Sequence, residues 1–195
     1  TNLELKGLQW VYGGLRMGGR SYYGLNLSDL DNPSLKFHVN PDAAVTTDAD
    51  GNTTPNTGNA LSYMGQSWSK PTLAYVKFGG VKKLVMFVGG GYDAGYENAA
   101  YNQNTTTGGG AGVYMFDANN GDLLWWSSAN ADAAKGAEAF TNASASTINM
   151  KYSVVSQINA IDRDSDGLVD NLYFGDLGGQ GFRVDLNNAA TGADA

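Results

Sequence analysis

The feature that most constrains the fold of this chain is a short pattern that occurs three times. Each copy begins with two glycines, continues as a strand that contains aromatic residues, and has Asn or Asp after that strand. The copies lie at residues 18–27, 109–118 and 178–186. The segments that precede the last two copies, 70–91 and 153–179, both have the order strand, turn, strand and glycine-rich exit. Repeated antiparallel sheets of this kind are typical of the blades of a β-propeller.

Short strands joined by tight turns are also predicted between the repeated segments. Residues 72–78 alternate between apolar and other side chains, and residues 83–88 form a short run of the buried type, with Lys83 followed by five apolar residues. A glycine pair separates them and favours a hairpin turn. Residues 113–117 and 123–127 flank an Asn-Gly pair, which is the strongest short signal for a hairpin because the turn needs positive φ angles.

The composition supports an all-β chain. Of the 195 residues 27 are Gly and only 4 are Pro, and amphipathic helical patterns are nearly absent. We therefore predict an all-β fold, part of a modified β-propeller with repeated antiparallel blades, in which residues 1–195 form one partial domain of about three blades. Three long polar segments, 41–65, 92–110 and 129–150, are predicted to be loop insertions. Because the chain begins with Thr-Asn rather than Met, we expect it to be a piece of a longer protein.

Charge and residue usage exclude several functional classes. The net charge of −7 and the pI near 4.5 argue against nucleic-acid binding and against a basic membrane-binding surface. The absence of Cys excludes disulfides, thiolate metal sites and Cys nucleophiles. A single His excludes sites that need several histidines, and no apolar run approaches the ~20 residues that span a bilayer. We found no hydrolase, zinc-protease or kinase signature, so we expect a protein that is not an enzyme.

One acidic motif carries the strongest chemical signal. Residues 162–170 have the pattern D-x-D-x-D-G-x-x-D, so four of the chain's sixteen Asp residues fall within nine positions. Such crowded carboxylates repel one another unless a cation is bound, and Ca²⁺ prefers six to eight oxygen ligands. Gly167 permits a sharp turn. The predicted calcium ligands are Asp162, Asp164, Asp166, the backbone carbonyl of Leu168, and Asp170.

The motif differs from an EF-hand. Position 12 is Tyr173 rather than the bidentate Glu of an EF-hand, and strand-like rather than helical residues flank the loop. In the alignment of the repeated units the motif takes the place of the turn at residues 79–82. We therefore predict that Ca²⁺ would staple a β-hairpin within one blade. A purely structural calcium ion and an acidic turn without metal are the alternative interpretations.

Other candidate residues have simpler interpretations. Residues 48–52 resemble half of a calcium loop but lack a fourth ligand, so we interpret them as a solvated turn. His38 lies in a predicted strand and is expected to be a hydrogen-bonded structural residue. Trp68, Trp125 and Trp126 are expected to pack between blades.

The motifs of this chain resemble those of a known family. Their order along the chain is similar to that in the C-terminal propeller domain of the PilC/PilY family of type IV pilus proteins. The segments that carry the resemblance are GLRMGGR (14–20), YYGLN (22–26), WSKP (68–71), VMFVGGGY (85–92), VYMFDANNG (113–121), the acidic motif (162–170), YFGDLGGQ (173–180) and FRVD (182–185). Each segment is weak alone, and their conjunction is fairly specific.

The resemblance implies a function. It implies a modified β-propeller with calcium bound by the acidic loop, in a parent protein at the pilus tip or outer-membrane surface of a Gram-negative bacterium. That parent would assist assembly of the type IV pilus (fimbrium) and mediate cell adhesion. Calcium occupancy would govern pilus extension against retraction, and hence twitching motility and virulence. The implied partners are pilins or minor pilins and host surface receptors, without nucleic acid and without membrane insertion by this segment.

Two competing functions stay open at the level of sequence. Integrin-α-like propellers also place this acidic motif between strands, as a structural or receptor-binding module with permanent calcium. Residues 117–125 resemble the tryptophan-docking turn of quinoprotein-type propeller dehydrogenases, but no residues of a cofactor site accompany them.

Overall fold

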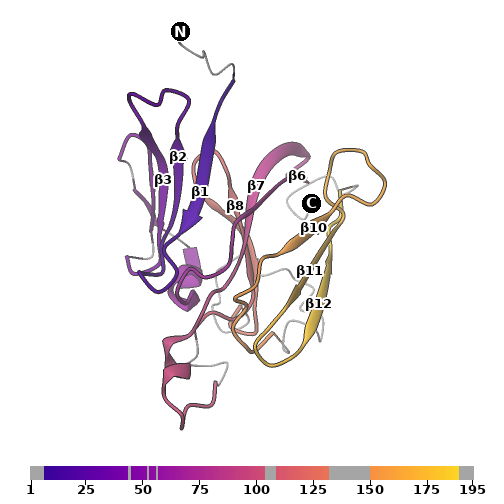
Figure 1. Ribbon diagram of the computed structural model, residues 1–195. Coiled ribbons are helices and arrows are strands. Elements are labelled where there is room, and N and C mark those ends of the chain that lie inside the picture. The colour runs from indigo at the N-terminus through magenta and orange to yellow at the C-terminus, as the bar shows by residue number, and fades with distance from the viewer. Residues whose placement is uncertain are drawn as a thin grey trace.

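The computed structural model describes residues 7–43, 45–51, 53–55, 57–103, 109–131 and 150–188. Within these residues the strands form three antiparallel sheets, and in each sheet every strand pairs with the next along the chain (Figure 1). The first sheet comprises β1 (Trp10–Gly14), β2 (Tyr22–Asn26), β3 (Ser34–Asn40), β4 (Val45–Asp48) and β5 (Thr53–Pro55). The second comprises β6 (Thr72–Phe78), β7 (Val81–Gly89), β8 (Val113–Asp117) and β9 (Leu123–Ser127). The third comprises β10 (Asn159–Ile161), β11 (Asn171–Gly175) and β12 (Gly181–Asp185).

Each of the three repeated sequence patterns contains one strand of a different sheet. Each glycine pair is followed by a strand, namely β2, β8 and β12. The two predicted hairpins also form, as β6–β7 and β8–β9. In the turn between β6 and β7, Gly79 and Gly80 have φ angles of +59° and +76°, as a hairpin with two left-handed residues requires. The all-β prediction is therefore confirmed.

The segment 41–65 was predicted to be a loop, and this prediction is wrong. It contains β4 and β5, which extend the first sheet, and the 3₁₀ helix η1 (Thr57–Tyr63). Pairing with β3 supplies the hydrogen bonds, and β-branched Thr residues suit a strand even in a polar segment. The segment 92–110 does connect β7 to β8, and the short 3₁₀ helix η2 (Ala94–Glu97) is its regular part among the described residues. Most of the segment 129–150 lies outside the described residues.

The two central strands of the second sheet, β7 and β8, are buried on both faces over most of their length. Along β7, Val85 and Phe87 face one core, whereas Met86 and Val88 face the other. β8 alternates in the same way, and all five of its residues are buried. One core lies against the first sheet and contains Tyr22, Phe37, Val39, Leu61 and Met64. The other core lies against the third sheet and contains Ile158, Leu172 and Phe174. This double burial explains the apolar run at residues 83–88.

The sheets meet at a junction of glycine-rich backbone, which we call the glycine junction (residues 63–66, 89–92, 109–112 and 153–154). Its backbone hydrogen bonds run from Gly110 N to Tyr63 O (2.7 Å), from Gly65 N to Gly90 O (2.8 Å) and from Val154 N to Gly110 O (2.8 Å). A Cβ atom on Gly90 would overlap the carbonyl of Gly110, and one on Gly110 would overlap the carbonyl of Gly91. Gly110 also has a φ of +84°. Side chains are therefore excluded where the backbones approach one another.

Two of the sequence motifs hold this architecture together through polar contacts. The guanidinium of Arg20 donates from Nε to the carbonyl of Met64 (2.8 Å) and from Nη2 to the carbonyl of Ser62 (2.7 Å). It thereby satisfies carbonyls at the end of η1. Ser69 Oγ donates to the carbonyl of Ser156 (2.7 Å) and accepts from Gly89 N (2.8 Å). The motif residues therefore have a structural role in joining the sheets.

His38 differs from its expected environment. Its ring stacks on the cross-strand neighbour Tyr23, with centroids 4.5 Å apart and an interplanar angle of 5°. Its Nε2 is buried and has no hydrogen-bond partner among the described residues. The expected hydrogen bond is therefore not found at Nε2, and the observed contact of the ring is its stacking on Tyr23. Partial burial lowers the pKa of His38, because the charged ring would be less well solvated than in water.

We predict that Gly110→Ala destabilises the chain far more than Gly79→Ala. Both glycines have positive φ, but a Cβ on Gly79 would meet no atom within 4 Å. Gly79→Ala should therefore cost only the left-handed strain of about 1–2 kcal/mol. Gly110→Ala adds overlap with backbone, for a total of roughly 3–5 kcal/mol. Urea unfolding measures both free energies, and equal losses would contradict the proposed role of the glycine junction.

We also predict a pH-dependent stability that originates at His38. Because the folded-state pKa lies below the unfolded value of about 6.5, this stability is full above that pH and is lost as the pH falls through it. The control is His38→Phe, which keeps a ring against Tyr23 but cannot titrate. The free energy of unfolding of the wild type should fall more between pH 7.5 and pH 5.5 than that of the variant. Parallel curves would refute the assignment.

Candidate metal centre

The acidic motif forms the connection between β10 and β11, in the position of a long hairpin loop (Figure 1). The last residue pair of the two strands is Ile161 with Asn171. Asp170 N then donates to the carbonyl of Ile161 (2.9 Å) and closes the base of the loop. Residues 162–169 therefore project beyond the sheet from a hydrogen-bonded base. This location agrees with the predicted place of the acidic motif in a β-hairpin connection.

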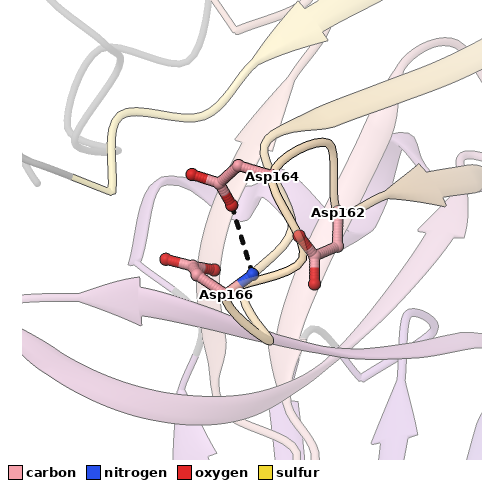
Figure 2. A group of neighbouring side chains, drawn as sticks. All are labelled: Asp162, Asp164 and Asp166. Carbon is pink, nitrogen blue, oxygen red and sulfur yellow. Dashed lines mark hydrogen bonds between the residues drawn. The ribbon is translucent and has the colours of Figure 1, made fainter.

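Three of the predicted ligands lie close together. One carboxylate oxygen from each of Asp162, Asp164 and Asp166 lies within 4.8 Å of the other two. Figure 2 shows the three side chains around the same turn of the loop. Asp162 is half-buried, whereas Asp164 and Asp166 are exposed to solvent. The spacing of alternate residues thus produces a cluster of oxygen atoms, as the sequence predicted.

Backbone N–H groups of the loop fix the orientation of these carboxylates. Asp162 accepts from Ser165 N through Oδ1 (2.7 Å) and from Gly167 N through Oδ2 (2.9 Å). Asp164 Oδ1 accepts from Asp166 N (3.2 Å), the bond drawn in Figure 2. Asp166 Oδ1 accepts from Leu168 N (2.7 Å). The loop is therefore wrapped around its own acidic side chains.

Two loop residues have left-handed backbone conformations. Gly167 has a φ of +85°, as expected for the sharp turn, and Ser165 has a φ of +64°. For Ser this conformation costs about 1–2 kcal/mol. The hydrogen bond from Ser165 N to Asp162 offsets part of that cost. The strain is stored where the three carboxylates converge, which is common at functional sites.

Asp170 occupies a different place from the other three aspartates. It is not part of the close cluster. Its Oδ2 accepts from Arg163 N (2.7 Å), across the base of the loop. Its Oδ1 accepts from the side-chain amide of Asn188 (3.3 Å). Leu168 lies between the cluster and Asp170. The ligand roles of Asp170 and of the Leu168 carbonyl stay predictions.

The donor set fits a hard divalent cation. The loop supplies carboxylate oxygens and backbone carbonyls, and it contains no His or Cys that would favour zinc. Among the described residues no Lys or Arg forms a salt bridge with Asp162, Asp164, Asp166 or Asp170. Several anionic oxygens within a few ångströms of one another suit Ca²⁺ better than Mg²⁺, which keeps most of its water.

The remaining candidates from the sequence have structural surroundings. Asp48 Oδ1 accepts from Asp50 N (3.0 Å) within the turn after β4, which suits the interpretation as a solvated turn. Trp68 packs against Tyr92, with the guanidinium of Arg16 4.6 Å from the centre of the Trp68 ring. Trp126 stacks on Tyr63 and Tyr114 in the core beside the first sheet. The tryptophans therefore pack within and between the sheets.

Sequence reasoning missed Asn188, which contacts Asp170 from beyond β12. The register of the third sheet could have indicated it. Asp185 pairs with Asn171, so the chain after β12 must run alongside the end of the acidic loop. Leu186 N indeed donates to the carbonyl of Asp170 (2.8 Å). Sequence motifs restricted to the loop contain no trace of this contact.

Comparison with known proteins gives one informative similarity. No known protein family and no curated protein matches the sequence. Among solved structures, the chain is similar to the C-terminal domain of PilY1 from Pseudomonas aeruginosa, with 22% sequence identity and a TM-score of 0.57. The similarity covers 91% of this chain and 26% of that one, so the chain spans about a quarter of the length of the solved domain. Among the described residues, no helix is long and apolar enough to cross a bilayer. The chain thus has an all-β, propeller-like fold similar to that of the PilY1 domain.

Proposed function

We propose that this chain is a calcium-binding, non-enzymatic module of a type IV pilus biogenesis and adhesion protein. The observation that carries the proposal is the cluster of Asp162, Asp164 and Asp166, whose carboxylate oxygens converge within 4.8 Å in a loop between two strands. The similarity of fold to the PilY1 domain supports the assignment to the pilus. The module would act in pilus assembly, in the control of retraction and in surface attachment.

The carboxylates of the acidic loop would bind the cation. Asp162 already holds the loop closed through two backbone N–H groups, so its carboxylate is oriented before a cation arrives. Asp164 and Asp166 each use one oxygen for the backbone and keep the other for a ligand. When bound, Ca²⁺ would supply positive charge that removes the mutual repulsion of these carboxylates. Its binding would stabilise the ordered loop by mass action.

The proposed setting is extracellular, at the pilus tip or outer-membrane surface of a Gram-negative bacterium. Calcium sites of extracellular modules work with dissociation constants of roughly 10⁻⁴–10⁻³ M, because calcium is abundant outside cells. An exposed loop of the kind formed by residues 162–170 suits that range. The proposed partners are pilins or minor pilins, and host surface receptors during attachment.

We predict that the chain binds one Ca²⁺ and that Asp164→Asn weakens this binding by about tenfold or more, because it removes one anionic ligand. Asn keeps an oxygen that can accept from Asp166 N, so the loop should stay folded. Isothermal titration calorimetry measures the affinity. Thermal melts should show stabilisation by about 2.7 kcal/mol at a hundredfold excess of calcium over the dissociation constant.

The matched control is Asp50→Asn, which removes the same charge from the turn after β4. It should leave the calcium affinity and the calcium-dependent melting unchanged. A folded wild-type chain that ignores millimolar calcium would contradict the proposal, and residues 162–170 would then be an acidic turn.

We predict a pilus phenotype for the same substitution in the parent protein. A bacterium that encodes Asp164→Asn should differ from the wild type in the number of surface pili and in the spread of twitching colonies, whereas Asp50→Asn should not. Calcium binding by the chain without any such difference would instead favour a permanent structural calcium, as in integrin-α-like propellers.

A further inference from the structure

The acidic loop is attached to the second sheet as well as to its own hairpin. Val169 N donates to the carbonyl of Tyr75, in β6, at 2.8 Å. The side chain of Val169 is only 6% exposed and packs in the same core as Val76. The exit of the loop therefore lies against β6, as the ribbon also shows (Figure 1). A change in the position of the loop exit would therefore act directly on β6.

The side chain of Asn188, which follows β12, forms hydrogen bonds with both β6 and the acidic loop. Its Oδ1 accepts from Lys77 N, in β6 (3.3 Å). Its Nδ2 donates to the carbonyl of Val169 (2.9 Å) and to Asp170 Oδ1 (3.3 Å). One side-chain amide thus contacts the second sheet through its oxygen and the acidic loop through its nitrogen. The polarity of the amide fixes this arrangement, because neither atom can replace the other.

A second contact comes from Lys82, near the start of β7. Lys82 Nζ lies 4.7 Å from the centre of the Tyr75 ring. The same atom lies 3.4 Å from the position that a Cβ on Gly167 would occupy. An ammonium group of the second sheet therefore borders the acidic loop. A divalent cation among the carboxylates would repel it, which adds an electrostatic link to the hydrogen-bonded one.

We propose that Asn188 is a positioning residue that fixes the orientation of the Asp170 carboxylate at the base of the acidic loop and transmits occupancy of the loop to the β6–β7 hairpin. The inference rests on the proposed calcium function, and it states how calcium occupancy would affect a neighbouring segment. A group that hydrogen-bonds a ligating carboxylate fixes its orientation, and its removal weakens metal binding by about 10–100-fold. Any shift of Asp170 on metal binding must also displace Asn188 and hence its bond to Lys77.

The experiment uses the full 195-residue chain and calcium chloride alone as the probe. Calorimetry on Asn188→Ala should show an affinity about tenfold or more below that of the wild type. The matched control is Asn187→Ala, which makes the same truncation at the neighbouring exposed position and should leave the affinity unchanged. In the wild type, the backbone amide resonance of Lys77 should shift during a calcium titration followed by NMR. In Asn188→Ala this shift should be lost.

The outcomes separate this inference from the proposed function. A wild-type chain that binds no calcium overturns both. Calcium binding that is equally tight in Asn188→Ala overturns the inference alone, as does a Lys77 amide that stays unshifted when the wild type is saturated. Because an unshifted Lys77 amide in the saturated wild type is sufficient to overturn the inference, it can be refuted even where Asn188→Ala fails to fold.

Discussion

Direct contact between backbones at the glycine junction determines how the rest of the chain can be arranged. Where residues 63–66, 89–92, 109–112 and 153–154 meet, carbonyl and N–H groups of different sheets pair without intervening side chains. This approach sets the spacing of the sheets at one end. Apolar side chains then fill the space between the sheets as they diverge, which gives one core on each side of the second sheet. Substitution at the junction therefore changes the packing of both cores at once.

The acidic loop lies at the opposite end of the hairpins from the glycine junction. The loop contacts β6 near its turn with β7, whereas the junction lies at the other end of β7 (Figure 1). At one end of the chain, backbone segments are in direct contact. At the other end, the acidic loop lies beside the start of β7, which carries Lys82. At the second end the residues of the acidic loop from 163 to 167 are exposed, and the loop is attached to β6 by the buried Val169 and by a few hydrogen bonds. A cation site that influences neighbouring segments is well placed there.

The predictions from sequence were correct where the information is local. Gly79 and Gly80 specify a hairpin turn on their own, and the apolar run at residues 83–88 specifies a strand with two buried faces. The acidic motif likewise predicted the convergence of Asp162, Asp164 and Asp166, because alternate residues in a tight loop point to one centre. The predictions failed where partners are distant. β4 and β5 exist because β3 offers an edge, and the role of Asn188 depends on a strand register that joins residues 18 positions apart.

The burial of both faces of the central strands limits which substitutions the chain can accept. A strand with one wet face accepts polar replacements at every second position, so half of its residues are open to neutral change. In β8 both faces are covered, and every position is under packing constraint. Positions that tolerate substitution therefore lie mainly in the connections between the strands. Changes in the recognition surface can therefore arise in these connections without disturbing the packing of β8.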